Sequence, residues 1–363
     1  MTRKFTSIFA LLLTGSLVLA ACGDGNDNEN DADNTGGNND NNTEENEVNN
    51  NNEDANEDEG NNEAAGDVNI GNLQLGTGST GGTYYPLGTE MATVINNNID
   101  VDGFDLSAIS TGASVENIVG IMSGEMDLGM SVHLPALDAL TGDGDFEGIE
   151  HDNFGFMGQI YPEVMQIVTG ADSGIESIAD LAGADIAIGP PGSGTQSAAK
   201  LILAAYGIED GDYNPYEEGF GDAAGRIQDG NLDASFGLLG LPAGGIDELA
   251  ASRDINLIPI SDEGLQYVED NSGYAAMTIP ADSYDFLEED IQAITAYAVL
   301  VGSTDTIDED LGYEIMKALY ENSGDIAHPQ GDYLTHENAM NGSDGLPLHP
   351  GAERYFEEEG LLD

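Results

Sequence analysis

The residues that could do chemistry in this 363-residue sequence gather in three short stretches rich in glycine and hydroxyl side chains. They are residues 76–86 (GTGSTGGTYYP), 111–117 (TGASVEN) and 189–196 (GPPGSGTQ). Each follows an apolar run that predicts a strand and precedes a helical pattern, so each places unpaired backbone N–H groups at the start of a helix. Such N–H groups attract anions. The three stretches therefore predict a site for a small carboxylate.

The first stretch imitates a dinucleotide-binding motif. Residues 76–81 fit the pattern G-x-G-x-x-G, and Asp100 lies about where that pattern expects an acid for the ribose. However, two tyrosines and Pro86 follow, and they put bulky groups where the motif needs close packing of the helix. Nicotinamide binding is therefore disfavoured.

The third stretch imitates a phosphate-binding P-loop in its glycines only. Thr195 occupies the position of the P-loop lysine, and Gln196 occupies the position of the hydroxyl that binds magnesium. An ATPase is excluded by these two positions. What remains is a turn of N–H groups before a helix, which can hold a carboxylate.

Motifs for catalysis or metal binding are missing elsewhere too. No serine lies in G-x-S-x-G, and the five histidines do not have the spacing of zinc ligands. We therefore expect no enzyme, no cofactor and no metal. The alternative from another class is an exported hydrolase, or another enzyme, that uses the same site.

The N-terminus has the pattern of an export signal. Arg3 and Lys4 precede the apolar run 8–20, which is too short to cross a bilayer, and small residues precede Cys22. This resembles a lipoprotein signal, so residues 1–21 are predicted to be removed and Cys22 to carry lipid at the outer face of the cell membrane. A plain secretory signal is the alternative. Cys22 is the single cysteine, so we expect no disulfide.

The next segment, residues 22–66, consists almost entirely of Asn, Asp, Glu and Gly. It has too few apolar side chains to offset the entropy of ordering, so it is predicted to be a disordered tether. The formal charge is −62, and loss of Arg3 and Lys4 would make it −64. This charge argues against nucleic acid and against an anionic lipid surface as partners. It favours a saline or alkaline exterior, in which counter-ions screen the charge.

The folded part alternates strand and helix patterns and predicts an α/β protein. A helix is expected at 84–95, and a second one is opened by residues 111–117 and runs to about 122. A long extended segment is expected at 154–169 and a short helix at 175–181. The length predicts two lobes. Residues 67–168 and 275–363 are predicted to form lobe 1, and residues 169–274 to form lobe 2. Two or more crossings between them would make a hinge beside a ligand cleft.

An ordered set of motifs resembles the TAXI family, the solute-binding proteins of tripartite ATP-independent periplasmic (TRAP) transporters. The matching stretches are residues 76–88, 111–117, 124–129 (GEMDLG), 161–163 (YPE), 171–175 (ADSGI), 191–195 (PGSGT), 240–242 (GLP) and 348–352 (LHPGA). The resemblance implies a two-lobed fold like that of periplasmic-binding proteins of type II. It also implies a receptor that closes on a glutamate-like amino acid or a dicarboxylate and delivers it to a TRAP-type permease.

The resemblance also implies which residues contact the solute. From the first stretch these are Ser79, Gly81, Thr83 and Tyr84; from the second, Thr111, Ser114 and Asn117; and from the third, Ser193, Gly194 and Thr195. A further alternative is a sensory solute-binding lipoprotein that works without a permease.

Overall fold

The computed structural model describes residues 72–148 and 151–362, and all of them belong to one compact unit. The predicted signal 1–21, the acylated Cys22 and the tether 22–66 lie outside the described residues. Within the described ranges, no helix has the length and apolar character needed to cross a membrane.

The described unit is a mixed α/β fold, which confirms the predicted class. The strands are β1 (Leu73–Gly76), β2 (Leu106–Ile109), β3 (Leu128–Val132), β4 (Phe154–Gly170), β5 (Asp185–Ala187), β6 (Asn214–Tyr216), β7 (Ala234–Leu239), β8 (Ile255–Leu257), β9 (Ala275–Ile279) and β10 (Ile291–Ser303). The helices are α1 (Tyr84–Asn98), α2 (Ser114–Ser123), α3 (His133–Thr141), α4 (Gly194–Ala205), α5 (Phe220–Gln228), α6 (Gly244–Ser252), α7 (Asp262–Asn271), α8 (Glu309–Glu321) and α9 (Pro350–Glu358).

One continuous sheet runs in the order β2-β1-β3-β10-β4-β7-β5-β6, with β8 added beside β4 and β9 beside β10. β1 pairs in parallel with β2 and β3, and β5 pairs in parallel with β6 and β7. Because parallel strands share a direction, the loops that follow them emerge at a common edge. The predicted turns after β1 and β2 emerge at one such edge. The predicted turn after β5 follows a strand of the opposite direction, because the antiparallel strands β10 and β4 lie between the two groups.

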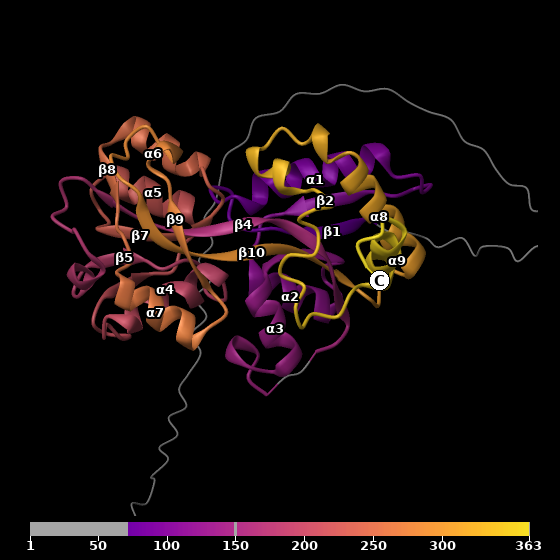
Figure 1. Ribbon diagram of the computed structural model, residues 1–363, viewed down its shortest axis with the longest axis horizontal. Coiled ribbons are helices and arrows are strands. Elements are labelled where there is room, and N and C mark those ends of the chain that lie inside the picture. Colours follow the sequence, from indigo (N-terminus) through magenta and orange to yellow (C-terminus); the bar gives the residue numbers. More distant parts are fainter. Residues whose placement is uncertain (1–71, 149–150, 363) are drawn as a thin grey trace, which may run out of the picture. The chain divides into compact units, whose positions relative to one another are not determined.

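Two long strands connect the parts of this sheet. β4 has 17 residues and β10 has 13, and they pair antiparallel between Phe154 and Val164 of β4. At about 3.3 Å per residue, β4 spans roughly 50 Å, which is enough to serve both parts of the sheet. In Figure 1 both strands run from the β1 side to the β7 side. The described unit therefore consists of two α/β parts that are joined by two crossing strands.

The apolar core changes along the crossing strands. Tyr161 and Ala298 belong to a core built from β1, β2, β3, α1, α8 and α9, whereas Val164 and Ile294 belong to cores built from α4 to α7. We call the part around the first core the first half and the part around the other two the second half. On β4 the core changes between Tyr161 and Val164, which is before position 169. On β10 it changes between Ile294 and Ala298, which is well after position 274. The predicted lobe boundaries stay a prediction.

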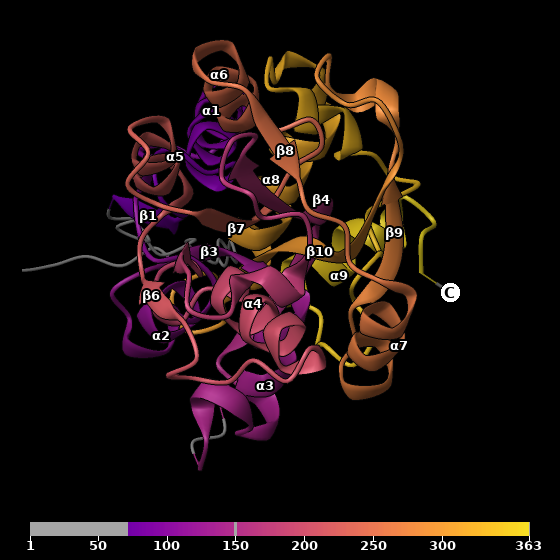
Figure 2. The same ribbon diagram turned by 90° about the vertical axis from the view of Figure 1, so that its left-hand side faces the viewer.

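The second half has one core on each face of its sheet. Helices α4 and α7 cover one face and α5 and α6 cover the other, as both views show (Figures 1 and 2). Along β4, Met165 and Ile167 pack on the first of these faces, and Val164 and Val168 pack on the second. This alternation explains why the strand reads as a continuous apolar run.

The predicted helix at 84–95 is confirmed as α1, and the predicted helix that residues 111–117 open is confirmed as α2, which begins at Ser114. The predicted helix at 175–181 is wrong. Only the 3-10 turn Ile178–Leu181 forms there, because a capping box of Ser177 and Asp180 starts a helix that Ala182, with extended backbone, ends at once.

Candidate functional site

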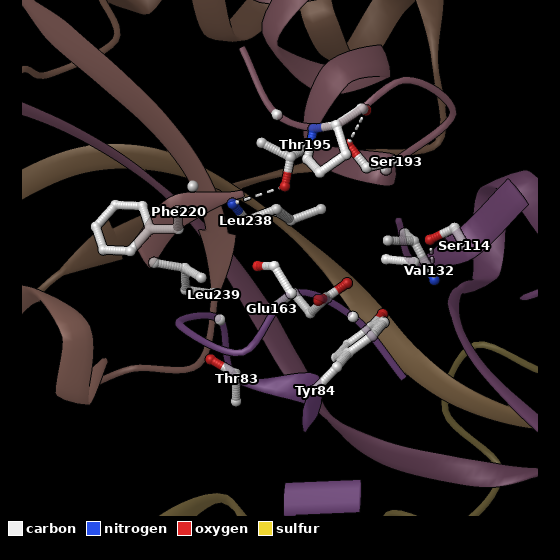
Figure 3. Close-up of a pocket in the computed structure, with 18 of the residues that line it drawn as sticks. Thr83, Tyr84, Ser114, Val132, Glu163, Ser193, Thr195, Phe220, Leu238 and Leu239 are labelled. Carbon is white, nitrogen blue, oxygen red and sulfur yellow. Dashed lines mark hydrogen bonds between the residues drawn. The ribbon is translucent and has the colours of Figure 1, made fainter. Parts of the chain in front are cut away.

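A cavity of about 60 Å³ lies where loops of the two halves meet (Figure 3). The first half contributes the loop before α1, the start of α2 and the end of β3. The second half contributes the turn before α4, the start of α5 and the end of β7. The residues that line it include Ser79, Thr83, Tyr84, Ser114, Val132, Glu163, Ser193, Gly194, Thr195, Phe220, Phe236, Leu238 and Leu239.

The loops of the two halves touch around this cavity. The amide of Val115 donates a hydrogen bond to the carbonyl of Gly192 at 3.0 Å, and the amide of Gly240 donates to Thr83 Oγ1 at 3.0 Å. A Cβ atom on Gly81 would lie 2.3 Å from the Cα of Gly221, so only glycine allows these two backbones to approach so closely. The structure therefore holds the two halves against each other.

The loop after β7 is held from both halves. Gln166 of β4 donates through its amide to the carbonyl of Gly240 at 2.9 Å. Gln330, in the 3-10 turn Pro329–Tyr333, donates to the carbonyl of Leu241 at 3.2 Å. The hydroxyl of Tyr284 donates to Gln166 Oε1 and accepts from the amide of Ala243. These hydrogen bonds fix the loop that contains Gly240, whose amide donates to Thr83.

Hydrogen-bond donors come from helix starts. Ser193 caps α4 by accepting from the amide of Gln196 at 3.1 Å. The amides of Gly194 and Thr195, at the first two positions of α4, make no hydrogen bond to any of the described residues. Ser114, which begins α2, accepts from the amide of Val132 at 3.1 Å. The free amides at the start of α4 can therefore bind an anionic group in the cavity.

A carboxyl group also faces the cavity. Glu163 of β4 is 2 % exposed, and Figure 3 shows it in the middle of the labelled residues, between Tyr84 and Leu238. Its Oε1 accepts from the hydroxyl of Tyr161 at 3.3 Å. Neither its Oε2 nor the nearby hydroxyl of Tyr84 has a hydrogen-bond partner among the described residues. Burial raises the pKa of Glu163 to about 8, although the hydroxyls of Tyr84 and Tyr161 lower it.

Seven of the ten residues predicted from the sequence line the cavity: Ser79, Thr83, Tyr84, Ser114, Ser193, Gly194 and Thr195. They come from loops of both halves, so the structure brings the first and third stretches together. Whether these residues contact a solute stays a prediction.

The other three predicted residues lie outside the cavity wall. Gly81 lines a neighbouring groove and contacts Gly221. Asn117 is fully buried, and its amide group donates to the carbonyls of Thr77 and Met130, each at 2.7 Å. Its Oδ1 accepts from the hydroxyl of Thr111 at 2.7 Å. Asn117 and Thr111 thus brace the loops after β1 and β2 from behind.

Sequence reasoning did not select Glu163 or the apolar wall, which consists of Val132, Phe220, Phe236, Leu238 and Leu239. Apolar residues in strands read as ordinary core, so nothing marked them. Glu163 did leave a signal, because it is the only charged residue in the 17 residues of β4. A lone carboxyl in a buried strand needs a partner or a function.

Replacing Asn117 by alanine removes three hydrogen bonds, two of them buried, and leaves the carbonyl of Thr77 with the hydroxyl of Thr111 as its remaining side-chain donor. We expect the free energy of unfolding to fall by about 2–4 kcal/mol in chemical denaturation. Asn98→Ala is the matched control, because Asn98 is exposed and bonds only to its own helix, at the carbonyl of Val94. Equal losses for both variants would contradict the bracing role.

Glu163 should make stability depend on pH. Its pKa is about 8 in the folded protein, compared with an ordinary 4.5, so between these values the folded chain holds a proton that the unfolded chain has lost. The free energy of unfolding should therefore fall as the pH rises from about 5 to 8, by on the order of a few kcal/mol from this group. Glu163→Gln should lack this fall, and Glu337→Gln, at an exposed position, should keep it. Parallel pH profiles for all three proteins would contradict it.

Several solved structures share the chain path in part. A protein of Bordetella bronchiseptica RB50 has a TM-score of 0.48 and 15 % identity, over 77 % of this chain and 83 % of that one. The alkanesulfonate-binding protein SsuA from Xanthomonas axonopodis pv. citri, bound to MOPS, has a TM-score of 0.45 and 16 % identity, over 79 % and 83 %. PhnD1 from Prochlorococcus marinus (MIT 9301), in complex with methylphosphonate, has a TM-score of 0.46 and 11 % identity, over 68 % and 82 %.

The family is shown by the sequence itself. The profile of the NMT1-like family matches residues 75–360, which begin in β1 and end just after α9. The match covers most of the chain and includes every loop that lines the cavity. The chain belongs to the NMT1-like family.

Proposed function

We propose that this protein is an extracytoplasmic solute receptor, held at the outer face of the cell membrane by a lipid on Cys22. It binds a small carboxylate solute, either a glutamate-like amino acid or a dicarboxylate, and delivers it to a TRAP-type permease. The observation that carries the proposal is a small cavity between two halves, with the free amides of Gly194 and Thr195 in its wall. The ordered motifs of the sequence supply the finer assignment to TRAP transport.

The proposed mechanism is closure of the two halves on the solute. β4 and β10 are the long connections between them, so a small change of twist in these strands would open the cavity. A solute that contacts the loop before α1 and the start of α4 together would favour the closed form. The bonds from Val115 to Gly192 and from Gly240 to Thr83 would form at the same time.

An exported hydrolase is less well supported by the same cavity. Ser79, Ser114 and Ser193 offer hydroxyl groups, but no histidine or lysine is among the described lining residues. A serine nucleophile needs such a base. A sensory lipoprotein would have the same cavity, and a TRAP permease gene beside this one would favour transport.

A bound solute must stabilise the folded state. In a thermal-shift screen of amino acids and organic acids in high salt, we expect at least one compound to raise the melting temperature by several degrees, since a ligand at 100 times its Kd adds about 2.7 kcal/mol. Small-angle scattering with that compound should show a smaller radius of gyration. If no compound of either kind stabilises the protein, the proposed function is wrong.

Closure should depend on the glycine contact. Gly81→Ala places a Cβ 2.3 Å from the Cα of Gly221, so the closed form becomes less favourable and affinity should fall at least tenfold in calorimetry. Gly225→Ala is the control, because a Cβ there meets no atom within 4 Å, and it should bind normally. Unchanged affinity and compaction in Gly81→Ala would contradict closure at this contact.

A further inference from the structure

The carboxyl group of Glu163 is the one group in the cavity wall that can carry a charge near neutral pH. No lysine, arginine, histidine or aspartate is among the described residues that line the cavity. The strand holds Glu163 firmly: its residue pairs with Ala296 of β10, and its carbonyl accepts from Thr295 Oγ1 at 2.7 Å. Since Oε2 has no partner, the group is positioned but not satisfied.

Tyrosine hydroxyls are the other titratable groups that face Glu163. Tyr84 comes from α1, Tyr161 from β4, and Tyr274 from the segment just before β9. The charge of Glu163 adds to burial in raising the pKa of each of them, so all three are neutral at physiological pH. They can donate hydrogen bonds, but none supplies the positive charge that a buried carboxylate needs.

The same small cavity presents the opposite character at the turn before α4. There the free amides of Gly194 and Thr195 and the start of the helix favour a negative group. One wall therefore suits an anion, and Glu163 suits a cation or a donor. A molecule that carries both kinds of group satisfies the whole cavity.

We propose that Glu163 is the subsite for an ammonium group, so that the receptor takes a zwitterionic α-amino acid in preference to a dicarboxylate. The inference rests on the proposed function, since it names the class of solute for the same cavity. The carboxylate of the amino acid lies at the start of α4, and its ammonium group donates to Oε2 of Glu163. The apolar wall, with Phe220, Phe236 and Leu238, receives the side chain.

Binding of an ammonium group then releases a proton. Burial raises the pKa of Glu163 to about 8, so at pH 7 its carboxyl group is mostly protonated in the unliganded protein. The ammonium group binds the ionised form, so the proton leaves to solvent. Proton release should be large at pH 7 and should fall as the pH rises through about 8, and affinity should rise over the same range.

The first test uses matched pairs of acids that differ only in the amine, with the full-length protein in high salt. The pairs are L-glutamate with glutarate and L-leucine with 4-methylpentanoate. Calorimetry should show the amine-bearing member of at least one pair binding tenfold or more tightly than its partner. Repeating that titration at pH 7 in buffers of different ionisation enthalpy should show the proton release.

Variants separate the subsite from general effects on folding. Glu163→Gln keeps the shape of the side chain and should weaken amino-acid binding tenfold or more, abolish the proton release and leave binding of the acid without an amine within about twofold. Glu337→Gln should behave as the wild type. The melting temperatures of both variants will show whether they are folded. Proton release is measured on the wild type, so it tests the subsite even if Glu163→Gln does not fold.

The outcomes distinguish the two proposals. Binding of organic acids with equal or greater affinity than their amino counterparts, or binding of an amino acid without proton release, overturns the ammonium subsite and leaves the solute receptor standing. If neither acids nor amino acids bind, both proposals fail. Amine-dependent binding with proton release that Glu163→Gln removes supports both.

Discussion

The antiparallel pairing of β4 with β10 joins the two halves of the described unit, and the position of each group in the cavity depends on it. Along β4 the apolar core changes between Tyr161 and Val164, so different helices bury different parts of this one strand. Glu163 lies at that change. Because an interior strand has few degrees of freedom, the carboxyl group is held at a fixed place between the loops of both halves.

Around this ladder, the cavity takes its polarity from backbone groups and one carboxyl, with no basic side chain among the described lining residues. This suits a chain with a formal charge of −62, in which added cations would form ion pairs with the surrounding acids. Backbone amides at the start of a helix form no such ion pairs, because they carry partial charges of fixed direction that act at short range.

The sequence predicted the α/β class and several elements, since apolar runs and glycine turns alternate strongly in this chain. It missed α3 and α7, each of which buries few apolar side chains. In α7 only Leu265 and Val268 are buried apolar residues, so their packing on α4 could not be read from the periodicity of the segment. The helix predicted at 175–181 was wrong, because a capping box marks a start and says nothing of length.

By itself, the sequence determined where strands turn into helices and which turns carry N–H and hydroxyl donors, since both depend on local residue types. It did not separate Ser193 and Thr195, which line the cavity, from Asn117, which braces a loop behind it. Only the tertiary structure decided that, and only it brought Glu163 to the cavity with a raised pKa. The burial of Glu163 and the lack of a hydrogen-bond partner for its Oε2 depend on segments that are distant in the chain. The residues next to Glu163 in the sequence therefore do not predict them.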